Sequence, residues 1–341
     1  MKDRFFDNTR VQEFRVCPRK YYFRHVIDLV PSGRWSPPLV FGSSWHAAMD
    51  TLWPLVAKNA PKMGDQEVVN AAYENFLDTW IDQGAPHPDD MTADEIKDLE
   101  PRTPFNAKEM LYEYLLQRRT FISDCEMLAV EKPFAVPLDP NNPDLFYVGR
   151  LDKVVRKGKN ILIPEHKTTT LYSVKGIFRN TFLDQFSPNS QVDGYLHGGH
   201  MVYGDDVKAV WIDGALVHKK VHDGFIFIPV ERQTSQLDAW LWETRYFIDQ
   251  IEGNWAAYED EKERGGPETN AYMAAFPKCT NSCQDFARNC PYIDLCKSWS
   301  NPMGHETPAG YVQDPWSPFD RLELDKIGMV KGEGDARNTK R

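Results

Sequence analysis

A short stretch of the chain, residues 147–168, constrains the fold more than any other segment. Two apolar runs flank a turn that contains glycine, and this pattern predicts a β-hairpin. If the turn is centred on residues 158 and 159, the numbers of paired residues sum to 317, and Asp152 faces Glu165. Side chains opposite each other in an antiparallel pair have Cβ atoms roughly 4.5–5.5 Å apart. The predicted hairpin therefore brings two carboxylates together.

Two facing carboxylates repel, so they destabilise a sheet unless a cation lies between them. Lys167 lies two residues beyond Glu165 and therefore on the same face of the strand. A surface hairpin with scattered charges is the plainer interpretation of these residues. Both strands are apolar on both faces, however, as in a buried central strand pair, and charges buried there need partners. We therefore expect a metal site at Asp152 and Glu165 beside the Lys167 ammonium.

Apolar periodicity outside the hairpin predicts further helices and strands. Ser43 or Ser44 is expected to cap the first of these helices. The acidic region 60–105 contains prolines and is expected to form helices joined by loops. Helices are predicted at 43–58, 106–124, 189–202 and about 232–259, and strands at 127–136, 146–156, 161–168, 207–217 and 224–230.

This order of elements predicts an α/β protein with one domain over residues 1–300 rather than two separate domains. A helical insertion at about 55–125 and a cysteine-rich segment at 279–296 belong to that domain. Residues 301–341 form an extension. Its end, from Lys326, is rich in glycine and charge and poor in apolar residues, so we expect disorder there.

The net charge and composition exclude few classes of function. The formal net charge of −10 gives no global basic field, which counts only weakly against a nucleic-acid partner. The N-terminus has no apolar signal region, and no uninterrupted apolar stretch is long enough to cross a bilayer. We therefore expect a soluble, intracellular, cytoplasmic protein without a membrane partner. In that compartment cysteines are more often thiols or metal ligands than disulfides.

Four cysteines fall within eighteen residues, with the spacing Cys279-x3-Cys283-x6-Cys290-x5-Cys296. Four thiolates suit tetrahedral zinc or an iron–sulfur cluster. Reduced cysteine without a ligand is the simpler interpretation, but the clustering favours a metal. The spacing differs from the paired CxxC pattern of a zinc ribbon.

Other candidate residues are uninformative when taken one at a time. His46 is a single histidine on an apolar helix, where most histidines are simply packed or exposed. Gln191 and Tyr195 are four residues apart on a predicted helix and share a face. The aromatic residues Tyr21, Tyr22, Phe23 and Trp35 lie near basic residues and could stack on bases or form core.

Taken together, these residues resemble the PD-(D/E)xK nuclease superfamily, and most nearly its RecB-like exonuclease branch. That branch includes phage-encoded members and the iron–sulfur nucleases of CRISPR adaptation. The resemblance covers most of residues 8–296 and follows the order of the family. The matching motifs are Cys17-Pro-Arg-Lys-Tyr-Tyr, Gly42-Ser-Ser-Trp-His46, Gly149-Arg-Leu-Asp152, Glu165-His-Lys167, Gln191-Val-Asp-Gly-Tyr195 and the trailing cysteines.

The resemblance implies a restriction-endonuclease-like fold, in which helices flank a mixed central sheet. It also implies a metal-dependent nuclease that hydrolyses DNA phosphodiester bonds, most nearly an exonuclease acting on single-stranded DNA ends. His46, Asp152, Glu165 and the backbone carbonyl of His166 would hold one or two Mg²⁺ or Mn²⁺ ions. A nitrogen ligand favours Mn²⁺ somewhat.

The remaining catalytic residues implied by the resemblance are Lys167, Gln191 and Tyr195. Lys167 would orient the attacking water and neutralise the charge that develops on the phosphate. Gln191 and Tyr195 would hold the nucleic-acid strand or brace the site.

The same resemblance implies that Cys17, Cys283, Cys290 and Cys296 hold a [4Fe–4S] cluster. Such a cluster would link N-terminal and C-terminal segments. Family members often carry CxxC where six residues separate Cys283 from Cys290 here. A local zinc site that uses Cys279 in place of Cys17 is the alternative.

A competing class is a nuclease-fold protein that binds DNA or assists recombination without catalysis and keeps a structural cysteine–metal site. The intact Asp152, Glu165 and Lys167 set argues against it, because a decayed site would be expected to lose one of the three. The sequence predicts no particular protein partner.

Overall fold

The computed structural model describes residues 5–33, 36–139, 141–172, 178–285 and 288–327. The chain divides into two compact units. Unit 1 comprises Met1–Arg34, Pro133–Gly149 and Thr234–Arg341, and unit 2 comprises Trp35–Lys132 and Arg150–Gln233. Nearly all of the segment predicted to be disordered lies outside the described residues. Within the described part, no helix is long and apolar enough to span a membrane.

A mixed sheet forms the centre of unit 2. Strand β5 (Asn160–Thr169) runs parallel to β6 (Val207–Leu216), and β7 (Phe225–Val230) runs antiparallel to β6. The end of β4 (Asn142–Lys157) pairs antiparallel with β5 on its other side. This arrangement confirms the predicted mixed central sheet. The boundaries between the two units fall within β4 and within β3 (Glu126–Asp139).

The register of the predicted hairpin is confirmed near its turn. Val155 pairs with Leu162, Arg156 with Ile161 and Lys157 with Asn160, so each pair of numbers sums to 317. Gly158 in the turn has φ +62°, a conformation that glycine adopts without steric cost. Asp152 lies three residues before Val155, whose pair is the farthest of the three from the turn.

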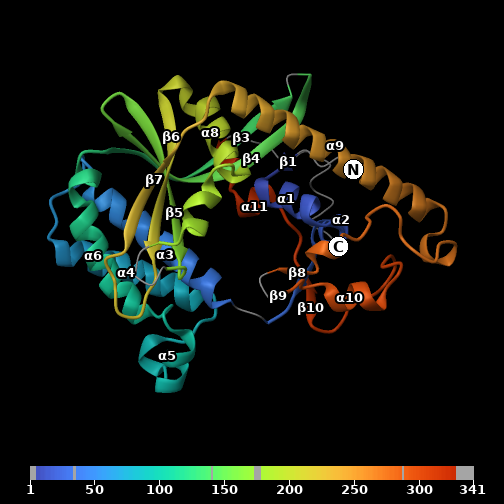
Figure 1. The fold of residues 1–341 in the computed structure, drawn as a ribbon, viewed down its shortest axis with the longest axis horizontal. Helices are drawn as coiled ribbons and strands as arrows, with labels where there is room; N and C mark the ends of the chain where they lie inside the picture. The colour runs from blue at the N-terminus through green and yellow to red at the C-terminus, as the bar shows by residue number, and fades with distance from the viewer. Residues whose placement is uncertain (1–4, 34–35, 140, 173–177, 286–287, 328–341) are drawn as a thin grey trace. The chain divides into compact units, whose positions relative to one another are not determined.

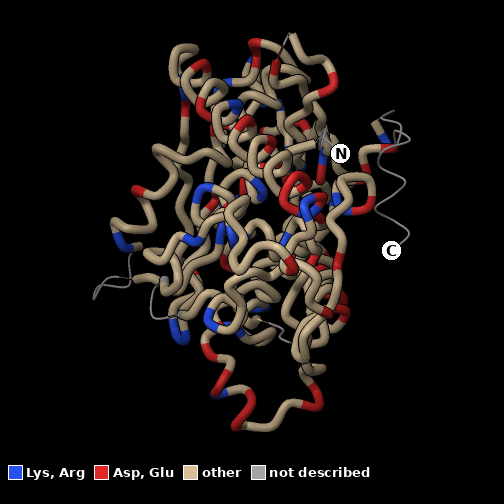
Figure 2. The backbone as a smooth tube through the Cα atoms, turned by 90° about the vertical axis from the view of Figure 1, so that its right-hand side faces the viewer, with Lys and Arg blue, Asp and Glu red and all other residues tan. Residues whose placement is uncertain are grey.

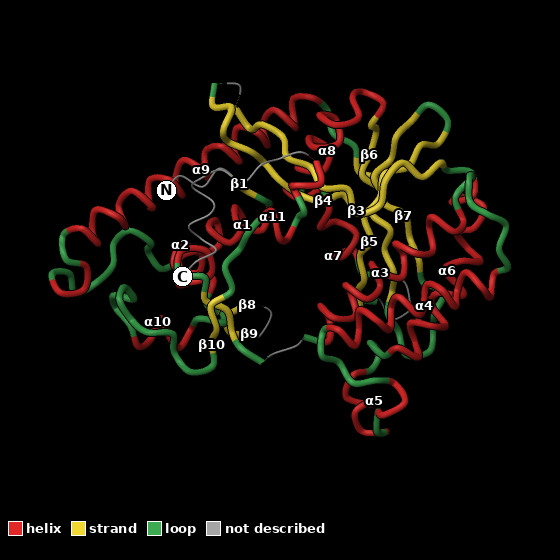
Figure 3. Tube along the Cα trace, turned by 180° about the vertical axis from the view of Figure 1, so that it is seen from behind, coloured by secondary structure: helices red, strands yellow, loops and turns green. Residues whose placement is uncertain are grey.

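Helices cover both faces of the sheet in unit 2 (Figures 1 and 3). On one face, α3 (Pro37–Val56), α4 (Asp65–Asp82) and α6 (Pro104–Ser123) share a hydrophobic core with strand residues such as Leu162 and Ala209. On the other face, α8 (Ser190–Tyr203) packs against β5 and β6. Because side chains alternate along a strand, Leu162 and its neighbour Ile163 face different helical layers.

The prediction that Ser43 or Ser44 caps the helix was wrong. Helix α3 begins at Pro37, six residues earlier, with prolines at its first positions. Proline is tolerated there because the missing N–H would be unpaired at a helix start anyway. The Ser43 hydroxyl instead donates back to the Leu39 carbonyl at 2.8 Å. A serine inside a helix makes this i−4 bond routinely.

The acidic stretch lies on the surface of unit 2. Helix α5 (Ala93–Leu99) contains no buried residue, and the red segments at the bottom of Figure 2 mark its carboxylates. Helix α4, by contrast, buries Val69, Phe76 and Trp80 in the same core as α3. Part of the predicted insertion is therefore integral to the core of unit 2, and α5 projects from it.

Unit 1 is built from short elements around one long helix, α9 (Thr234–Glu263). Strand β1 (Phe5–Phe6) pairs with the first half of β4. The other elements are α1 (Asn8–Val16), α2 (Pro18–Tyr21), α10 (Ile293–Ser298), α11 (Pro318–Arg321) and the two-stranded pairs β2 (Leu29–Pro31) with β10 (Tyr311–Gln313) and β8 (Gln284–Asp285) with β9 (Arg288–Asn289).

Base stacking by the N-terminal aromatic residues is excluded in this structure. Tyr21, Tyr22 and Phe23 are at most 1% exposed. The Tyr22 ring lies 5.6 Å from the Phe276 ring and the Phe23 ring lies 5.1 Å from the Tyr292 ring, centroid to centroid. These side chains form core within unit 1, which was the alternative interpretation. Trp35 lies outside the described residues.

We expect Gly149→Ala to lower the free energy of unfolding by about 1–3 kcal/mol, because overpacking a core forces its neighbours to shift. A Cβ atom at Gly149 would lie 2.7 Å from Cζ of the Phe134 ring, which cannot bend away. Chemical denaturation would measure the change. The control is Gly253→Ala in α9, where no heavy atom lies within 4 Å of the added Cβ. Equal stability of Gly149→Ala and the wild type would contradict the close packing.

Candidate active site

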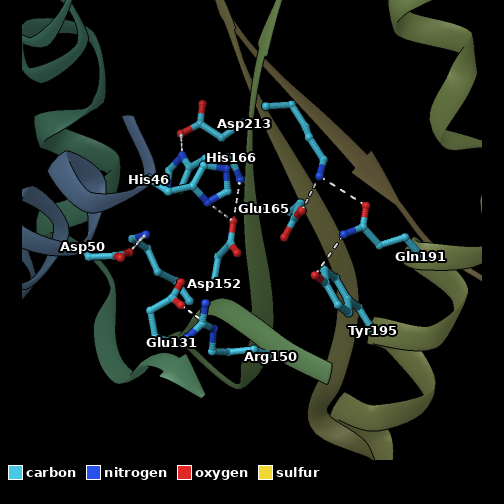
Figure 4. Close-up of polar contacts among 12 residues, drawn as sticks. His46, Asp50, Glu131, Arg150, Asp152, Glu165, His166, Gln191, Tyr195 and Asp213 are labelled. Carbon is cyan, nitrogen blue, oxygen red and sulfur yellow. Dashed lines mark hydrogen bonds and ion pairs between the residues drawn. The ribbon is translucent and has the colours of Figure 1, made fainter. Parts of the chain in front are cut away.

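All seven residues predicted to form the catalytic centre lie in unit 2, and the structure brings their side chains or backbone together (Figure 4). Glu165 and Lys167 lie on the face of β5 that α8 covers. Asp152 comes from β4 and His46 from α3, while Gln191 and Tyr195 come from α8. Asp152 and Glu165 are separated in the chain by the hairpin turn, but they lie near each other in the fold, as the sequence predicts.

The Lys167 ammonium is held between a carboxylate and an amide. Its Nζ donates to Glu165 Oε1 at 2.6 Å and to Gln191 Oε1 at 3.2 Å. The amide nitrogen of Gln191 in turn donates to the Tyr195 hydroxyl at 3.0 Å. The i, i+4 pair on α8 thus orients the ammonium. The resemblance implies that Gln191 and Tyr195 either hold the nucleic-acid strand or brace the site, and their catalytic role stays a prediction.

The Asp152 carboxylate is only 7% exposed and has two partners. His46 Nδ1 lies 3.1 Å from Asp152 Oδ2, and the backbone N–H of His166 donates to the same oxygen at 3.1 Å. Burial alone would raise the pKa of Asp152. The charge and hydrogen bond of His46 outweigh burial and hold that pKa well below its ordinary value. Asp152 is therefore ionised.

Glu165 behaves in the opposite way. Its side chain is 2% exposed, and burial together with the negative charge of Asp152 raises its pKa to about 7. Lys167 counteracts this shift only in part. Glu165 Oε2 is buried and has no hydrogen-bond partner among the described residues. An oxygen left in this state is costly and calls for a donor or a cation.

Two further charge pairs flank Asp152, and the sequence analysis did not identify them. Lys153 Nζ lies 2.7 Å from Asp50 Oδ1, although the Lys153 side chain is fully buried. Arg150 Nε lies 2.5 Å from Glu131 Oε2. Asp50 is four residues beyond His46 on α3, so the i, i+4 spacing on one helix was a signal that could have found it. No local pattern marks Glu131.

The backbone at Glu131 is unusual as well. Its φ is +47°, a left-handed conformation that costs a non-glycine residue roughly 1–3 kcal/mol. Burial, followed by the charges of Asp152 and Asp50, raises the pKa of Glu131 to about 7. The negative potential around Asp152 therefore extends to a third carboxyl group.

The donor set suits Mg²⁺ or Mn²⁺. These ions prefer carboxylate oxygens, and Glu165 Oε2 lacks the partner that an ion would supply. In the described part of the chain, no three His, Cys, Asp or Glu side chains are already arranged to hold an ion. His46 is instead paired with Asp152. The assignment of His46, Asp152, Glu165 and the His166 carbonyl as ligands thus stays a prediction.

The cysteines of the predicted metal segment all lie in unit 1. Cys17 is buried, and its sulfur accepts a hydrogen bond from the Cys279 backbone N–H at 3.3 Å. The hairpin of β8 and β9 places Cys283 opposite Cys290, whose N–H donates to the Cys283 carbonyl at 2.8 Å. The six intervening residues therefore do not separate these two positions in space. The cysteines form no disulfide, and the structure does not show a metal site among its described residues.

Comparison with known proteins supplies a family. A sequence model described as the PD-(D/E)XK nuclease superfamily matches residues 8–297. No curated protein matches the chain. A crystal structure described as a "Putative exonuclease" from Eubacterium rectale superimposes with a TM-score of 0.46 at 13% identity, over 93% of this chain and 92% of that one.

We expect Glu165 and Glu131 to stabilise the metal-free protein below pH 4.5 and to lose this contribution as the pH rises through about 7. Glu165 and Glu131 have raised pKa values, so the folded state binds their protons more tightly than the unfolded state does. That stabilisation is complete below 4.5 and is lost as the pH passes about 7. The raised pKa of His46 acts in the same direction. The lowered pKa values of buried His166 and His25 act in the opposite direction. Denaturation at pH 5 and pH 8 would measure the net difference in stability.

Glu165→Gln isolates the Glu165 contribution, because the amide carries no proton to lose: relative to the variant, the wild type should be less favoured at pH 8 than at pH 5. Glu243→Gln, at an exposed position of α9, is the matched control and should leave the profile unchanged. A Glu165→Gln profile identical to that of the wild type between pH 5 and pH 8 would contradict the assigned electrostatics.

Proposed function

The chain belongs to the PD-(D/E)XK nuclease superfamily, and on this premise we propose that it is a metal-dependent deoxyribonuclease that degrades single-stranded DNA from its ends. Nucleases of this superfamily act on DNA and generally use Mg²⁺ or Mn²⁺. The observation that carries the proposal is the buried pair Asp152 and Glu165, with Glu165 Oε2 unpartnered among the described residues and the Lys167 ammonium 2.6 Å from the other oxygen.

The proposed ligands are the carboxylates of Asp152 and Glu165, the His166 carbonyl and His46. A bound divalent ion activates water and stabilises charge on the scissile phosphate. His46 and the His166 N–H fix the orientation of the Asp152 carboxylate, at 3.1 Å each. Low exposure of both carboxylates keeps bulk water away, which strengthens every charge interaction in the site.

Lys167 acts on the water and the phosphate in this proposal. Its Nζ is bound by Glu165 and Gln191, so the ammonium cannot swing into solvent freely. The nearby carboxylates also raise its pKa against the effect of burial, so it stays protonated. A fixed positive charge beside the reacting phosphate stabilises the negative charge that develops in the transition state. Tyr195 acts through Gln191 and is a positioning residue.

Exposed basic and aromatic side chains lie just beyond the ends of β5 and β6, and they support contact with a DNA strand. Tyr172 follows β5, is 42% exposed and packs edge-on against the His218 ring at 4.6 Å between centroids. Arg179 donates to the Tyr172 carbonyl at 2.9 Å. Lys219 and Lys220 follow β6 and are exposed. An exposed ring flanked by cations is the usual combination for binding a single strand.

We also propose that residues 1–300 function as one nuclease domain, with the cysteine segment contributed by unit 1. In this proposal Cys17, Cys283, Cys290 and Cys296 hold a [4Fe–4S] cluster, and a zinc site that uses Cys279 is the alternative. The cross-strand placement of Cys283 and Cys290 supports a shared metal. Lys278, which donates to the Cys296 carbonyl at 2.7 Å, adds positive charge near the thiols.

Lys167→Ala should abolish cleavage of end-labelled linear single-stranded DNA in Mn²⁺ or Mg²⁺, with a loss of about a hundredfold or more in rate, because the fixed charge disappears. The wild type should degrade the linear strand, spare a circular strand and be inactive in EDTA. Lys208→Ala, at an exposed lysine of β6, is the control and should keep full activity.

The other outcomes of this assay are informative. Cleavage of the circle by the wild type would make the protein an endonuclease with the same chemistry. No cleavage of any substrate by anaerobically purified wild type would refute the catalytic proposal. A DNA-binding or recombination accessory protein without catalysis would then be the remaining function.

Cys17→Ala should lose protein-bound iron and the visible absorbance of the cluster after anaerobic purification, since a cluster needs all four thiolates. Cys125→Ala removes a buried cysteine of unit 2 and should retain both. Elemental analysis would measure iron and zinc together. Zinc retained in Cys17→Ala but lost in Cys279→Ala would establish the alternative site.

A further inference from the structure

A buried polar network lies on the face of β5 opposite to Glu165 and Lys167. His166 stands between these two residues in sequence, so its ring points to the other side of the strand. Asp213 is its partner in the parallel ladder between β5 and β6. The His166 side chain is fully buried and the Asp213 side chain is 1% exposed. Both lie towards the layer formed by α3 and α6.

Asp213 joins three elements of unit 2. The Tyr114 hydroxyl, from α6, donates to Asp213 Oδ2 at 2.5 Å, and it accepts from Trp53 Nε1 of α3 at 2.8 Å. His166 Nδ1 lies 3.2 Å from the same carboxylate oxygen. Arg118, one turn beyond Tyr114, brings its Nε to 3.6 Å from Asp213 Oδ1. Asp213 therefore accepts directly from α6, lies within charge-pair distance of His166 on β5, and is linked to α3 through the Tyr114 hydroxyl.

Burying the Asp213 carboxylate is unfavourable for the free energy of folding. Burying a carboxylate costs several kcal/mol, and replacing a whole ion pair or triad by apolar side chains of similar volume often leaves stability unchanged or higher. Asp213 Oδ1 and both ring nitrogens of His166 have no hydrogen-bond partner among the described residues. Asp213 satisfies the buried Tyr114 hydroxyl but only part of the polar groups around it. The positions of the side chains around Asp213 therefore indicate a second role for this buried carboxylate.

The buried network contacts the two groups that hold the Asp152 carboxylate. The His166 ring packs edge-on against the His46 ring at 5.9 Å between centroids, and His46 Nδ1 holds Asp152 (Figure 4). The backbone N–H of His166 holds the same Asp152 oxygen. A shift of the His166 ring would move the His46 ring that packs against it, and a shift of the His166 backbone would move the second donor to Asp152.

We propose that Asp213 is a positioning residue of the active centre, which acts through His166 to set the His46 ring and the His166 backbone against Asp152. Tyr114 holds Asp213 and Trp53 holds Tyr114, so α3 and α6 together set the orientation of the Asp152 carboxylate. The proposal rests on the proposed function, because it assigns the network a role in the binding of the divalent ion.

Asp213→Leu tests the network, since leucine fills similar space but accepts no hydrogen bond. Its unfolding midpoint without metal should fall, because the Tyr114 hydroxyl and Arg118 lose their common partner. Its Mn²⁺ dissociation constant, measured by calorimetry without DNA, should rise about ten- to a hundredfold, as for residues that orient metal ligands. Asp213→Asn keeps an acceptor for Tyr114 and should recover part of the affinity. It also serves as the folded variant if the leucine form does not fold.

Tyr114→Phe should weaken Mn²⁺ binding in the same direction. Combined with Asp213→Leu, it should add little, because the two residues act through one contact. Val69→Ala, in the core of α4, is the control for destabilisation alone, and it should lower the unfolding midpoint without changing the Mn²⁺ dissociation constant. A Mn²⁺ dissociation constant within twofold of the wild type in folded Asp213→Leu, or in Asp213→Asn if the leucine form is unfolded, would overturn the proposal.

Failure of the proposed function gives a different result. A wild type that binds no Mn²⁺ and cleaves no DNA would refute the function without testing Asp213. The crystal structure of metal-free Asp213→Leu, or of Asp213→Asn if the leucine form does not fold, then decides. Displacement of the His46 ring from Asp152 would support the positioning role, and an unchanged contact of about 3.1 Å would overturn it.

Discussion

The approach of two buried carboxylates, Asp152 and Glu165, is the constraint on which the centre of unit 2 depends. Like charges at this burial cannot both ionise freely, and the two groups respond in opposite directions, with a lowered pKa for Asp152 and a raised pKa for Glu165. The difference follows from their neighbours. Asp152 has a histidine and a backbone N–H, while one oxygen of Glu165 has no partner among the described residues.

Along β5 the reactive side chains and the anchoring side chain lie on different faces of the sheet, although His46 of the α3 layer also contacts Asp152 on β4. Glu165 and Lys167 point towards α8, whereas His166 points towards α3 and α6, because neighbouring side chains on a strand alternate. Lys153 follows Asp152 and reaches Asp50 of α3 in the same manner. Each reactive residue therefore has a buried neighbour in sequence that ties its strand to the helical layer. The position of a reactive carboxylate is consequently set by groups that never contact a substrate.

Parts of this arrangement follow from local rules, and others do not. The turn at Gly158 and the period of two along each strand were enough to predict the register of Val155 and Leu162. The start of α3 was missed, because a serine followed by an apolar run resembles a cap even when prolines upstream begin the helix. Asp213 was not identified at all. Its bond to Tyr114 joins residues 99 positions apart, and no periodicity connects them.

The sequence alone determined the hairpin, its register near the turn, and the motif order that marks the superfamily. These features depend on turn chemistry and on alternation, which act over a few residues. Tertiary structure decided which charged side chains meet: Asp50 and Asp213 come from elements distant in the chain from their partners or from Asp152, and Glu131 comes from β3, the strand before β4. Packing brings such groups together, and a buried charge can be interpreted only when all of its neighbours are known.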